Sequence, residues 1–177
     1  MSLGVITNSG RVLMARMLLG HKLDGITHCA IGDGDETFAD PLNPPEPSVD
    51  QRGLKHECAR KRYLRRGFLM EDENGAVVVD GVSYAETADE TDTVGVFFQF
   101  DECEANGIVI KEYGFFGGGV AYRDGVESHY AAGGVYHPDT NPEGQVLNAG
   151  YLYEVRKIAD FHKLPDTRVE IVGIIRL

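Results

Sequence analysis

The sequence predicts an α+β fold, in which one N-terminal helix packs on a mainly antiparallel β-sheet or sandwich with long loops. Strong helix formers fill residues 12–19, behind polar N-cap candidates and ahead of a glycine. Beyond them, β-branched and aromatic runs are separated by turn signals, among them Asn74-Gly75 and Asn106-Gly107. The spacing of those signals predicts about six to eight strands. One helix followed by many strands indicates the α+β class.

Length and composition indicate one domain over residues 1–177. A chain of 177 residues, 42% of them hydrophobic, is long enough to bury a sizeable core. It has no apolar run near the roughly 20 residues that span a bilayer, and no secretory leader pattern at its start, so no membrane partner is expected. The three cysteines are odd in number and lack a CxxC pair, which predicts free thiols in a reducing compartment.

The helix is expected over about residues 8–20. Thr7, Asn8 and Ser9 offer N-cap side chains, and Gly20 supplies the stop. Its residues are apolar around most of the circumference, so we expect it to lie buried against a sheet or a partner. The last strand is apolar as well. Because both elements need cover beyond that of one sheet, we expect a homo-oligomer, or a monomer that is stable only beside its partner.

The first half of the chain combines strands with a proline-rich loop. A strand is expected at residues 25–31. Residues 40–50 form an extended surface loop, because four of the seven prolines lie there. Residues 56–70 fit neither the helix period nor the strand period cleanly. The hairpin signal at Asn74-Gly75 needs a strand on each side, and it favours the strand interpretation.

The second half carries two further strand pairs around a glycine-rich loop. β-rich runs at residues 93–100 and 108–116 are separated by the second Asn-Gly turn. Residues 117–150 are rich in glycine, proline and tyrosine, and are expected to form a long loop with at most short strands. Residues 151–161 and 168–177 form the last strand pair, which a Pro-Asp turn connects.

Charge is distributed unevenly along the chain. The formal net charge is -11, which disfavours general nucleic-acid binding because the long-range field repels phosphate. Between Arg52 and Arg66, however, seven basic residues accompany one acidic residue. A local basic segment on an acidic body suits docking to an acidic neighbour or to a second copy of the chain. The alternative is a solvated edge with alternating charges. The predicted partner interface, here called the basic strip, consists of Arg60, Lys61, Arg62, Arg65 and Arg66.

No catalytic residue, cofactor site or metal site is predicted. The acidic loop that begins at Asp33 does not match an EF-hand, because Phe38 and Pro44 stand where glycine and glutamate are required. A solvated turn is favoured there over an irregular cation site. The six histidines show no HxH or HExxH spacing, and there is no GxSxG segment. Lys111 and Glu112 follow each other on a predicted strand, so they point to opposite faces and cannot form one catalytic pair.

Four segments together resemble the N-terminal domains of bacteriophage tail-collar and tail-fibre proteins. The segments are Ile6-Thr7-Asn8-Ser9-Gly10-Arg11, Ala30-Ile31-Gly32-Asp33-Gly34, Ile110-Lys111-Glu112-Tyr113-Gly114-Phe115-Phe116 and the closing stretch from Lys163 to Leu177. They are similar to the family's "T-N-x-G" start, its strand ending in "G-D-G", its "K-E-I-G-L-F" segment and its final strand. Tyr113 replaces the commoner aliphatic residue, and no fibre shaft follows Leu177.

This resemblance implies a structural virion protein of a phage or phage-like tail, which joins the baseplate to a tail fibre or receptor-binding protein. Its expected partners are other tail and baseplate proteins and a tail fibre, and its expected location is the virion, after assembly in the bacterial host cytoplasm. Two alternatives stay open. A carbohydrate-binding β-sandwich would use exposed aromatics such as Tyr122, Tyr130 and Tyr136. An enzyme of unknown class would need convergent polar groups in one pocket.

Overall fold

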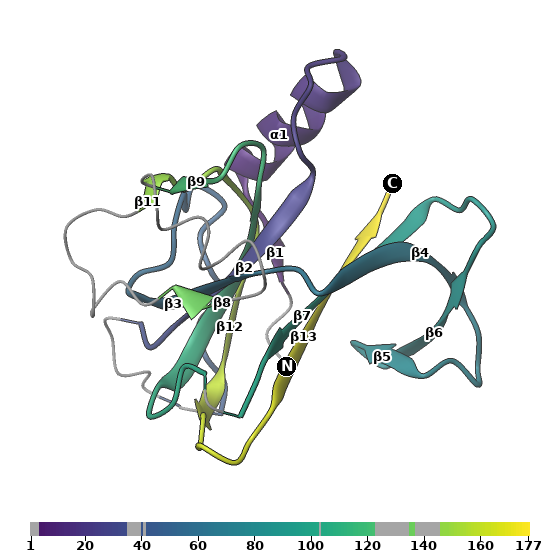
Figure 1. Ribbon diagram of the computed structural model, residues 1–177. Coiled ribbons are helices and arrows are strands. Elements are labelled where there is room, and N and C mark those ends of the chain that lie inside the picture. The colour runs from purple at the N-terminus through teal and green to yellow at the C-terminus, as the bar shows by residue number, and fades with distance from the viewer. Residues whose placement is uncertain (1–3, 35–39, 41, 103, 123–134, 137–145) are drawn as a thin grey trace.

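The computed structural model describes residues 4–34, 40, 42–102, 104–122, 135–136 and 146–177. Within these residues the chain forms one helix and a series of antiparallel strands (Figure 1). The elements, in chain order, are β1 (Val5–Ile6), α1 (Asn8–Leu18), β2 (Ile26–Gly32), β3 (Glu57–Arg62), β4 (Arg65–Glu71), β5 (Val77–Val79), β6 (Val82–Thr87), β7 (Thr93–Phe100), β8 (Val109–Gly117), β9 (Ala121–Tyr122), β10 (Val135–Tyr136), β11 (Val146–Asn148), β12 (Tyr151–His162) and β13 (Val169–Arg176).

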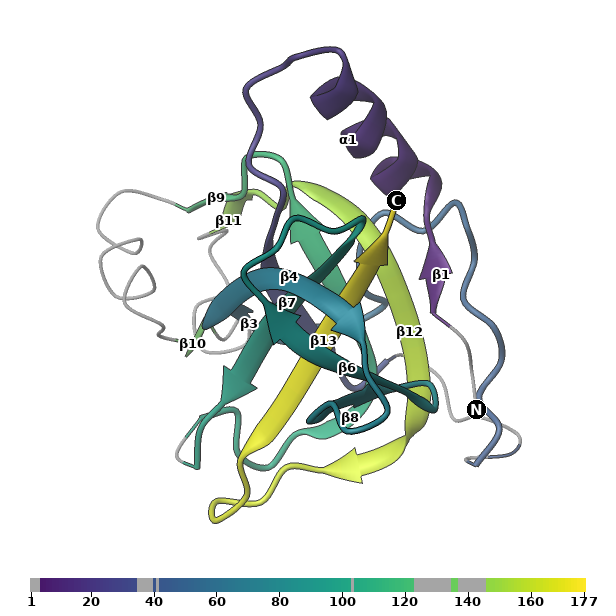
Figure 2. The same cartoon turned by 90° about the vertical axis from the view of Figure 1, so that its right-hand side faces the viewer.

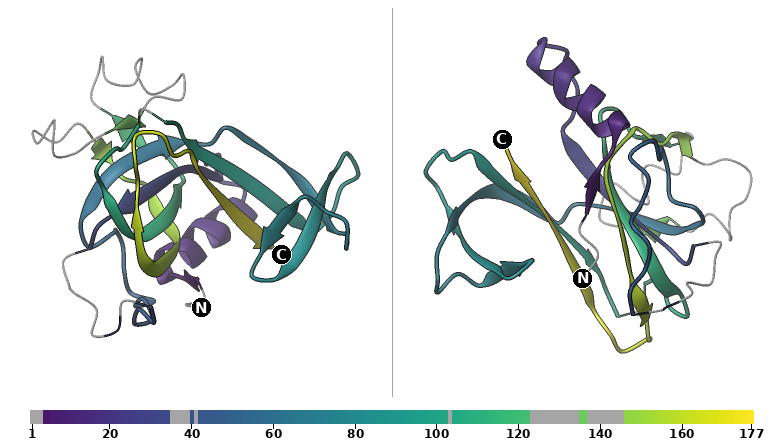
Figure 3. Two further views of the ribbon diagram at one scale, coloured as in Figure 1. Left: turned by 90° about the horizontal axis from the view of Figure 1, so that it is seen from below. Right: turned by 180° about the vertical axis from the view of Figure 1, so that it is seen from behind.

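The strands form two main sheets. One has the order β1-β12-β8-β2-β3-β10 and the other the order β13-β7-β4-β6-β5, while β11 and β9 form a separate pair. The chain passes directly from β3 in the first sheet to β4 in the second (Figure 2). At this crossing Tyr63 N donates to Thr27 O at 3.0 Å and Leu64 N donates to Phe97 O at 2.8 Å. The backbone pairing therefore continues from one sheet to the next, and the strands curve around in a nearly closed, barrel-like arrangement (Figure 3).

The predicted α+β class is wrong, because the protein is mostly β. Strands make up 51% of the described residues and the helix 8%. The helix itself occurs where it was predicted, but it buries only Gly10 and Leu13 and projects beyond one end of the sheets (Figures 1 and 2). Its C-terminal leucines face solvent, with Leu18 86% exposed. The core lies instead between sheet faces, so the helix does not form a layer of the fold.

The main core fills the space between the two sheets. It combines inward residues of β2 and β8 with those of β7 and β13, and the Phe98 and Phe115 rings stack with centroids 5.4 Å apart. A second cluster on the opposite face of the first sheet contains Phe116, Leu152 and Val155, and Leu54 covers it. β2 is therefore buried along its whole length, and β8 is buried from Gly114 to Gly117.

The helix is attached to the central sheet through its first turn. Thr7 caps the helix, because its Oγ1 accepts from Gly10 N at 3.0 Å, and the same hydroxyl donates to Leu152 O. Gly10 lies directly on β12, where a Cβ atom would come within 2.4 Å of the carbonyl oxygen of Tyr153. Only glycine allows the helix to approach the strand this closely.

Most of the long strands occur where the sequence predicts them, but β6 was not predicted, and the segment 56–70 forms two strands, β3 and β4. The predicted pairing of the last two strands is wrong, because β12 and β13 belong to different sheets. The hairpin predicted at Asn74-Gly75 is wrong, because β4 pairs with β6 and β5 also pairs with β6. The tight turn lies at Asp80 and Gly81, which both have positive φ (50° and 83°) between the paired residues Val79 and Val82. An Asp-Gly pair is typical of such two-residue turns. More strands form than the sequence predicts, since several have only two or three residues.

The predicted loops lie partly outside the described residues. Residues 42–50 contain no helix or strand, as the proline content predicts. In the glycine-rich segment the structure describes residues 117–122, 135–136 and 146–150, which contain β9, β10 and β11. Tyr130 lies outside the described residues. No described helix is long and apolar enough to span a membrane.

Candidate functional site

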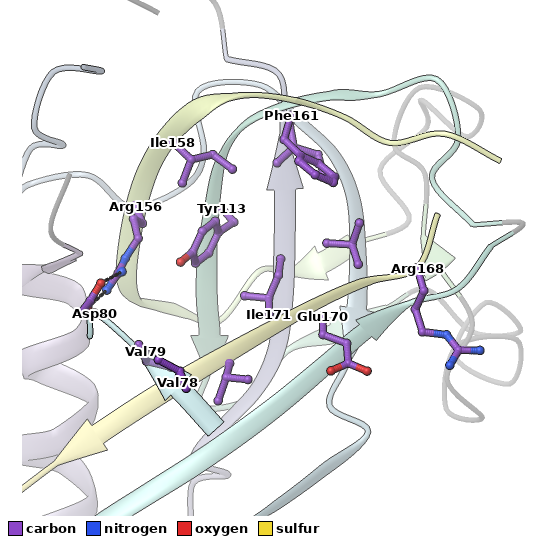
Figure 4. A pocket seen from close by; sticks show the side chains of 13 residues that line it. Val78, Val79, Asp80, Tyr113, Arg156, Ile158, Phe161, Arg168, Glu170 and Ile171 are labelled. Atoms are coloured by element: carbon purple, nitrogen blue, oxygen red, sulfur yellow. Dashed lines mark hydrogen bonds and ion pairs between the residues drawn. The ribbon is translucent and has the colours of Figure 1, made fainter. Parts of the chain in front are cut away.

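A groove of about 530 Å³ lies between the two sheets, where β12 and β8 face β13 and the tip of β5 (Figure 4). Most of its wall is apolar. The apolar side chains are Val78, Val79, Ile110, Ile158, Phe161, Val169, Ile171 and Val172. Phe161 is 41% exposed, so its ring is accessible to a ligand. A concave, largely apolar surface with a few polar groups is the usual form of a small-molecule site.

The polar part of the groove is centred on Arg156 of β12. Its two terminal nitrogens donate to the two carboxylate oxygens of Asp80 at 2.8 and 3.0 Å, and Glu154 Oε1 lies 3.2 Å away. Its Nε is buried and has no hydrogen-bond partner among the described residues. The Tyr113 hydroxyl points toward this ion pair (Figure 4). A planar, bidentate pair of this kind is a specific polar anchor on an apolar wall.

Burial shifts the pKa values of the polar side chains in and beside the groove. Burial raises the pKa of Tyr113 far above its ordinary value, so the phenol stays protonated and can donate a hydrogen bond. Burial would lower the pKa of Arg156, but the hydrogen bond to Asp80 and the neighbouring acidic groups raise it on balance. Burial also raises the pKa of Glu154. These groups supply hydrogen-bond donors and acceptors beside the apolar wall of the groove.

The structure separates the basic strip into two parts. Arg60 is only 2% exposed and donates to both carboxylate oxygens of Glu57 at 2.8 Å, while its guanidinium lies 4.0 Å from the Phe116 ring centroid. Lys61 is 7% exposed and pairs with Glu104. Both charges are therefore used inside the molecule, on opposite faces of β3.

Arg62, Arg65 and Arg66 are exposed and lie together at the crossing from β3 to β4. The guanidiniums of Arg62 and Arg66 lie 5.4 and 4.9 Å from the ring centroid of Tyr63. Arg65 lies 3.6 Å from the Phe97 ring and pairs with Glu86 at 2.6 Å. These three residues form the surface part of the predicted interface, here called the arginine cluster. Exposure gives them access to a partner, while the ring contacts limit their movement.

Lys111 and Glu112 point to different surroundings, as the strand period predicts. Glu112 is 1% exposed, and its Oε1 accepts from the backbone N–H groups of Lys55 at 2.6 Å and His56 at 3.1 Å. Lys111 is half-buried. Glu112 therefore anchors the backbone that leads into β3 to the neighbouring strand β8, which is an architectural role.

Replacing Glu112 with glutamine should lower the free energy of unfolding by about 1–2 kcal/mol, because a charge-assisted acceptor for two backbone donors is exchanged for a neutral one. Urea denaturation measures the change. Glu170→Gln is the matched control, since Glu170 is exposed, and it should alter stability by about 0.5 kcal/mol or less. A stable Glu112→Gln protein that had lost a measurable turnover would contradict the architectural role.

Three potential metal ligands meet where β2 ends and β3 begins. They are Asp33, His56 and Cys58, whose donor atoms all lie within 4.8 Å of one another. His56 Nδ1 lies 2.5 Å from Asp33 Oδ1 and 3.8 Å from Cys58 Sγ. Sequence reasoning missed this cluster because His56 and Cys58 join Asp33 only through the pairing of β2 with β3. The His-x-Cys spacing on a strand is the signal that could have indicated it.

The tyrosines expected of a carbohydrate-binding surface are not an exposed platform in the described residues. Tyr122 is buried, and its ring meets that of His28 edge to face with centroids 5.7 Å apart. Tyr130 and the side chain of Tyr136 lie outside the described part of the chain.

No protein-family model matches the sequence, and no curated protein matches it.

Proposed function

We propose that this chain is a structural protein of a phage or phage-like tail, where it joins the baseplate to a tail fibre or receptor-binding protein. The observation that supports the proposal is the position of the segments that resemble the tail-collar and tail-fibre family. Thr7 and Gly10 attach the helix to β12, while Gly32 at the end of β2 pairs with Glu112 of β8. The family-like residues thus serve architecture, as expected of an assembly protein.

The exposed end of the helix supports a partner in the assembly. Leu18 and Leu19 face solvent, and Leu177 at the other end of the chain is 74% exposed. Leu13, Met17 and Leu177 line an apolar depression of about 170 Å³ between the helix and the second sheet. The last strand, by contrast, is covered within the molecule, since Ile171 and Ile175 belong to the main core. We therefore place the homo-oligomer or tail-protein contact at the helix end rather than at β13.

The arginine cluster supplies a second, charged contact to an acidic neighbour. Replacing Arg62 and Arg65 with glutamate should slow particle assembly, because exposed charges around an interface mainly raise the association rate. Rising salt should slow the wild type, since screening acts over a Debye length of about 8–10 Å. Light scattering during assembly measures both rates.

A second double reversal controls for net charge. Arg168 directly precedes β13 and Arg176 ends it, and both are exposed and form surface ion pairs. Arg168→Glu with Arg176→Glu therefore changes the net charge equally. That variant should assemble at the normal rate. Normal assembly of the Arg62 and Arg65 reversal at low salt would show that the cluster is a solvated edge.

Localisation tests the function itself. Tail particles purified from cells that encode the chain should contain it, and an antibody against it should label the junction of baseplate and fibre in electron micrographs. Particles made without the chain should lack fibres. Complete, infective particles from which the chain is absent would refute the proposal.

The groove supports a second candidate, a carbohydrate-binding module. Sugar rings stack on aromatic faces and accept hydrogen bonds from charged planar groups, and both Phe161 and the Arg156–Asp80 pair line the groove. A glycan array tests this candidate. Glycan binding that Phe161→Ala abolishes would favour the carbohydrate-binding module over a purely structural role. The absence of binding to any glycan on the array would reject it.

A further inference from the structure

We propose that Asp33, His56 and Cys58 form a binding site for a zinc-class divalent cation, with three ligands from the chain and the fourth position open to water. The site is independent of the proposed tail function. Its three donors are one carboxylate oxygen, one imidazole nitrogen and one sulfur, all within 4.8 Å of one another.

The donor distances fit a tetrahedral ion after a small movement. Bond lengths of about 2.0–2.3 Å place neighbouring donors of a zinc site about 3.3–3.6 Å apart. The separation of His56 Nδ1 from Cys58 Sγ, 3.8 Å, is close to that value. The Asp33 carboxylate lies 2.5 Å from Nδ1 and within 4.8 Å of Cys58 Sγ, so it has to move by about 1 Å. Its side chain is 42% exposed, so it has the freedom to do so.

The fold holds the ligands from two neighbouring strands. Asp33 directly follows β2, His56 directly precedes β3, and Cys58 lies on β3 and is buried. A register shift between Ile31 and Gly32 in this strand pair brings the two ends together. Glu112 fixes the backbone of His56 through the bond to its N–H. Supporting hydrogen bonds of this kind position ligands before the ion arrives.

The ligand types select the ion. Calcium and magnesium prefer oxygen donors, whereas thiolate and imidazole favour zinc and similar transition ions. Four ligands from the chain are typical of closed structural zinc sites, while three leave one position for a water molecule. His56 has a side-chain exposure of 48%, so this fourth position faces solvent.

Cobalt(II) is the probe, because a thiolate ligand produces a charge-transfer absorption band and a tetrahedral site gives intense visible bands. The purified full chain, without an added histidine tag, should bind one cobalt ion with both signatures, and zinc should displace it. Cys58→Ala should remove the charge-transfer band. Asp33→Asn and His56→Asn should each weaken binding at least about tenfold.

Matched variants separate this site from incidental binding. Cys29 is a buried thiol on the neighbouring strand, and His162 is an exposed histidine at the end of β12. Cys29→Ala and His162→Asn should both bind cobalt as the wild type does. Circular dichroism confirms that each variant is folded, and Asp33→Asn changes only a half-exposed side chain. No charge-transfer band in the wild type, or an unchanged band in Cys58→Ala, would overturn the proposal.

Discussion

Replacing Arg60 with methionine should lower the free energy of unfolding by about 3 kcal/mol or more. Removing one member of a buried ion pair leaves the other without its charge partner, which typically costs about 3–5 kcal/mol. Here the loss includes two bonds to Glu57, one to the carbonyl oxygen of Ala149 and the contact with the Phe116 ring. Glu57 is 20% exposed, so water relieves part of the cost and the lower end of that range applies.

Arg62→Met is the control for this change. Arg62 lies two residues further along the same strand, and so on the same face, but it is exposed. Its replacement should change stability by about 0.5 kcal/mol or less. Urea denaturation at neutral pH compares the two. If both substitutions change the free energy of unfolding equally little, the buried contacts of Arg60 do not stabilise the first sheet.

The second large effect is a loss of stability in acid that originates at His28. Burial, followed by the charges of Arg60 and Arg62, lowers the pKa of His28 from 6.5 to about 3. Between these values the unfolded chain binds a proton that the folded protein does not. Stability is therefore unaffected by this group above pH 6.5 and falls as the pH drops toward 3. The free energy of unfolding falls by about 1.4 kcal/mol for each pH unit below 6.5.

A difference measurement isolates this contribution from the many carboxylates. The unfolding free energies of the wild type and of His28→Asn are measured at pH 7 and pH 4.5. Between the two conditions the wild type should lose about 2–3 kcal/mol more than the variant. His162→Asn should keep the wild-type pH dependence, since His162 is exposed. A parallel loss in the wild type and His28→Asn would mean that His28 becomes charged inside the fold.

The helix and the long strands were predictable because their signals are local. Thr7 and Gly20 mark the ends of α1, and runs of β-branched and aromatic residues mark β7, β8 and β13. The fold class was not predictable, because the apolar content of a helix does not show whether another part of the protein covers it. Leu18 is as apolar as Leu13, yet only Leu13 meets a sheet. Strand partners depend on distant residues, and so the role of Asp80-Gly81 was missed.

The candidate site residues also divide into those that local patterns indicate and those that depend on distant parts of the chain. Alternation along β3 separates Arg60 from Lys61, but it does not reveal that both faces of this strand are covered. Phe116 and Glu57 bury one charge, and Glu104 the other. Of the basic strip, only Arg62, Arg65 and Arg66, which lie beyond the covered part of β3, are exposed. The cluster of Asp33, His56 and Cys58 needs the register of β2 and β3, which no local pattern contains.

The unbroken passage from β3 to β4 has a mechanical consequence. The arginine cluster lies on a stretch of backbone that is hydrogen-bonded to β2 in the first sheet and to β7 in the second. A pull applied there along the strand direction loads the hydrogen bonds of both sheets in shear, and many bonds must break together. A pull at the β5–β6 hairpin peels bonds one at a time. A tether at the cluster is thus expected to resist tension better than one at the β5–β6 hairpin.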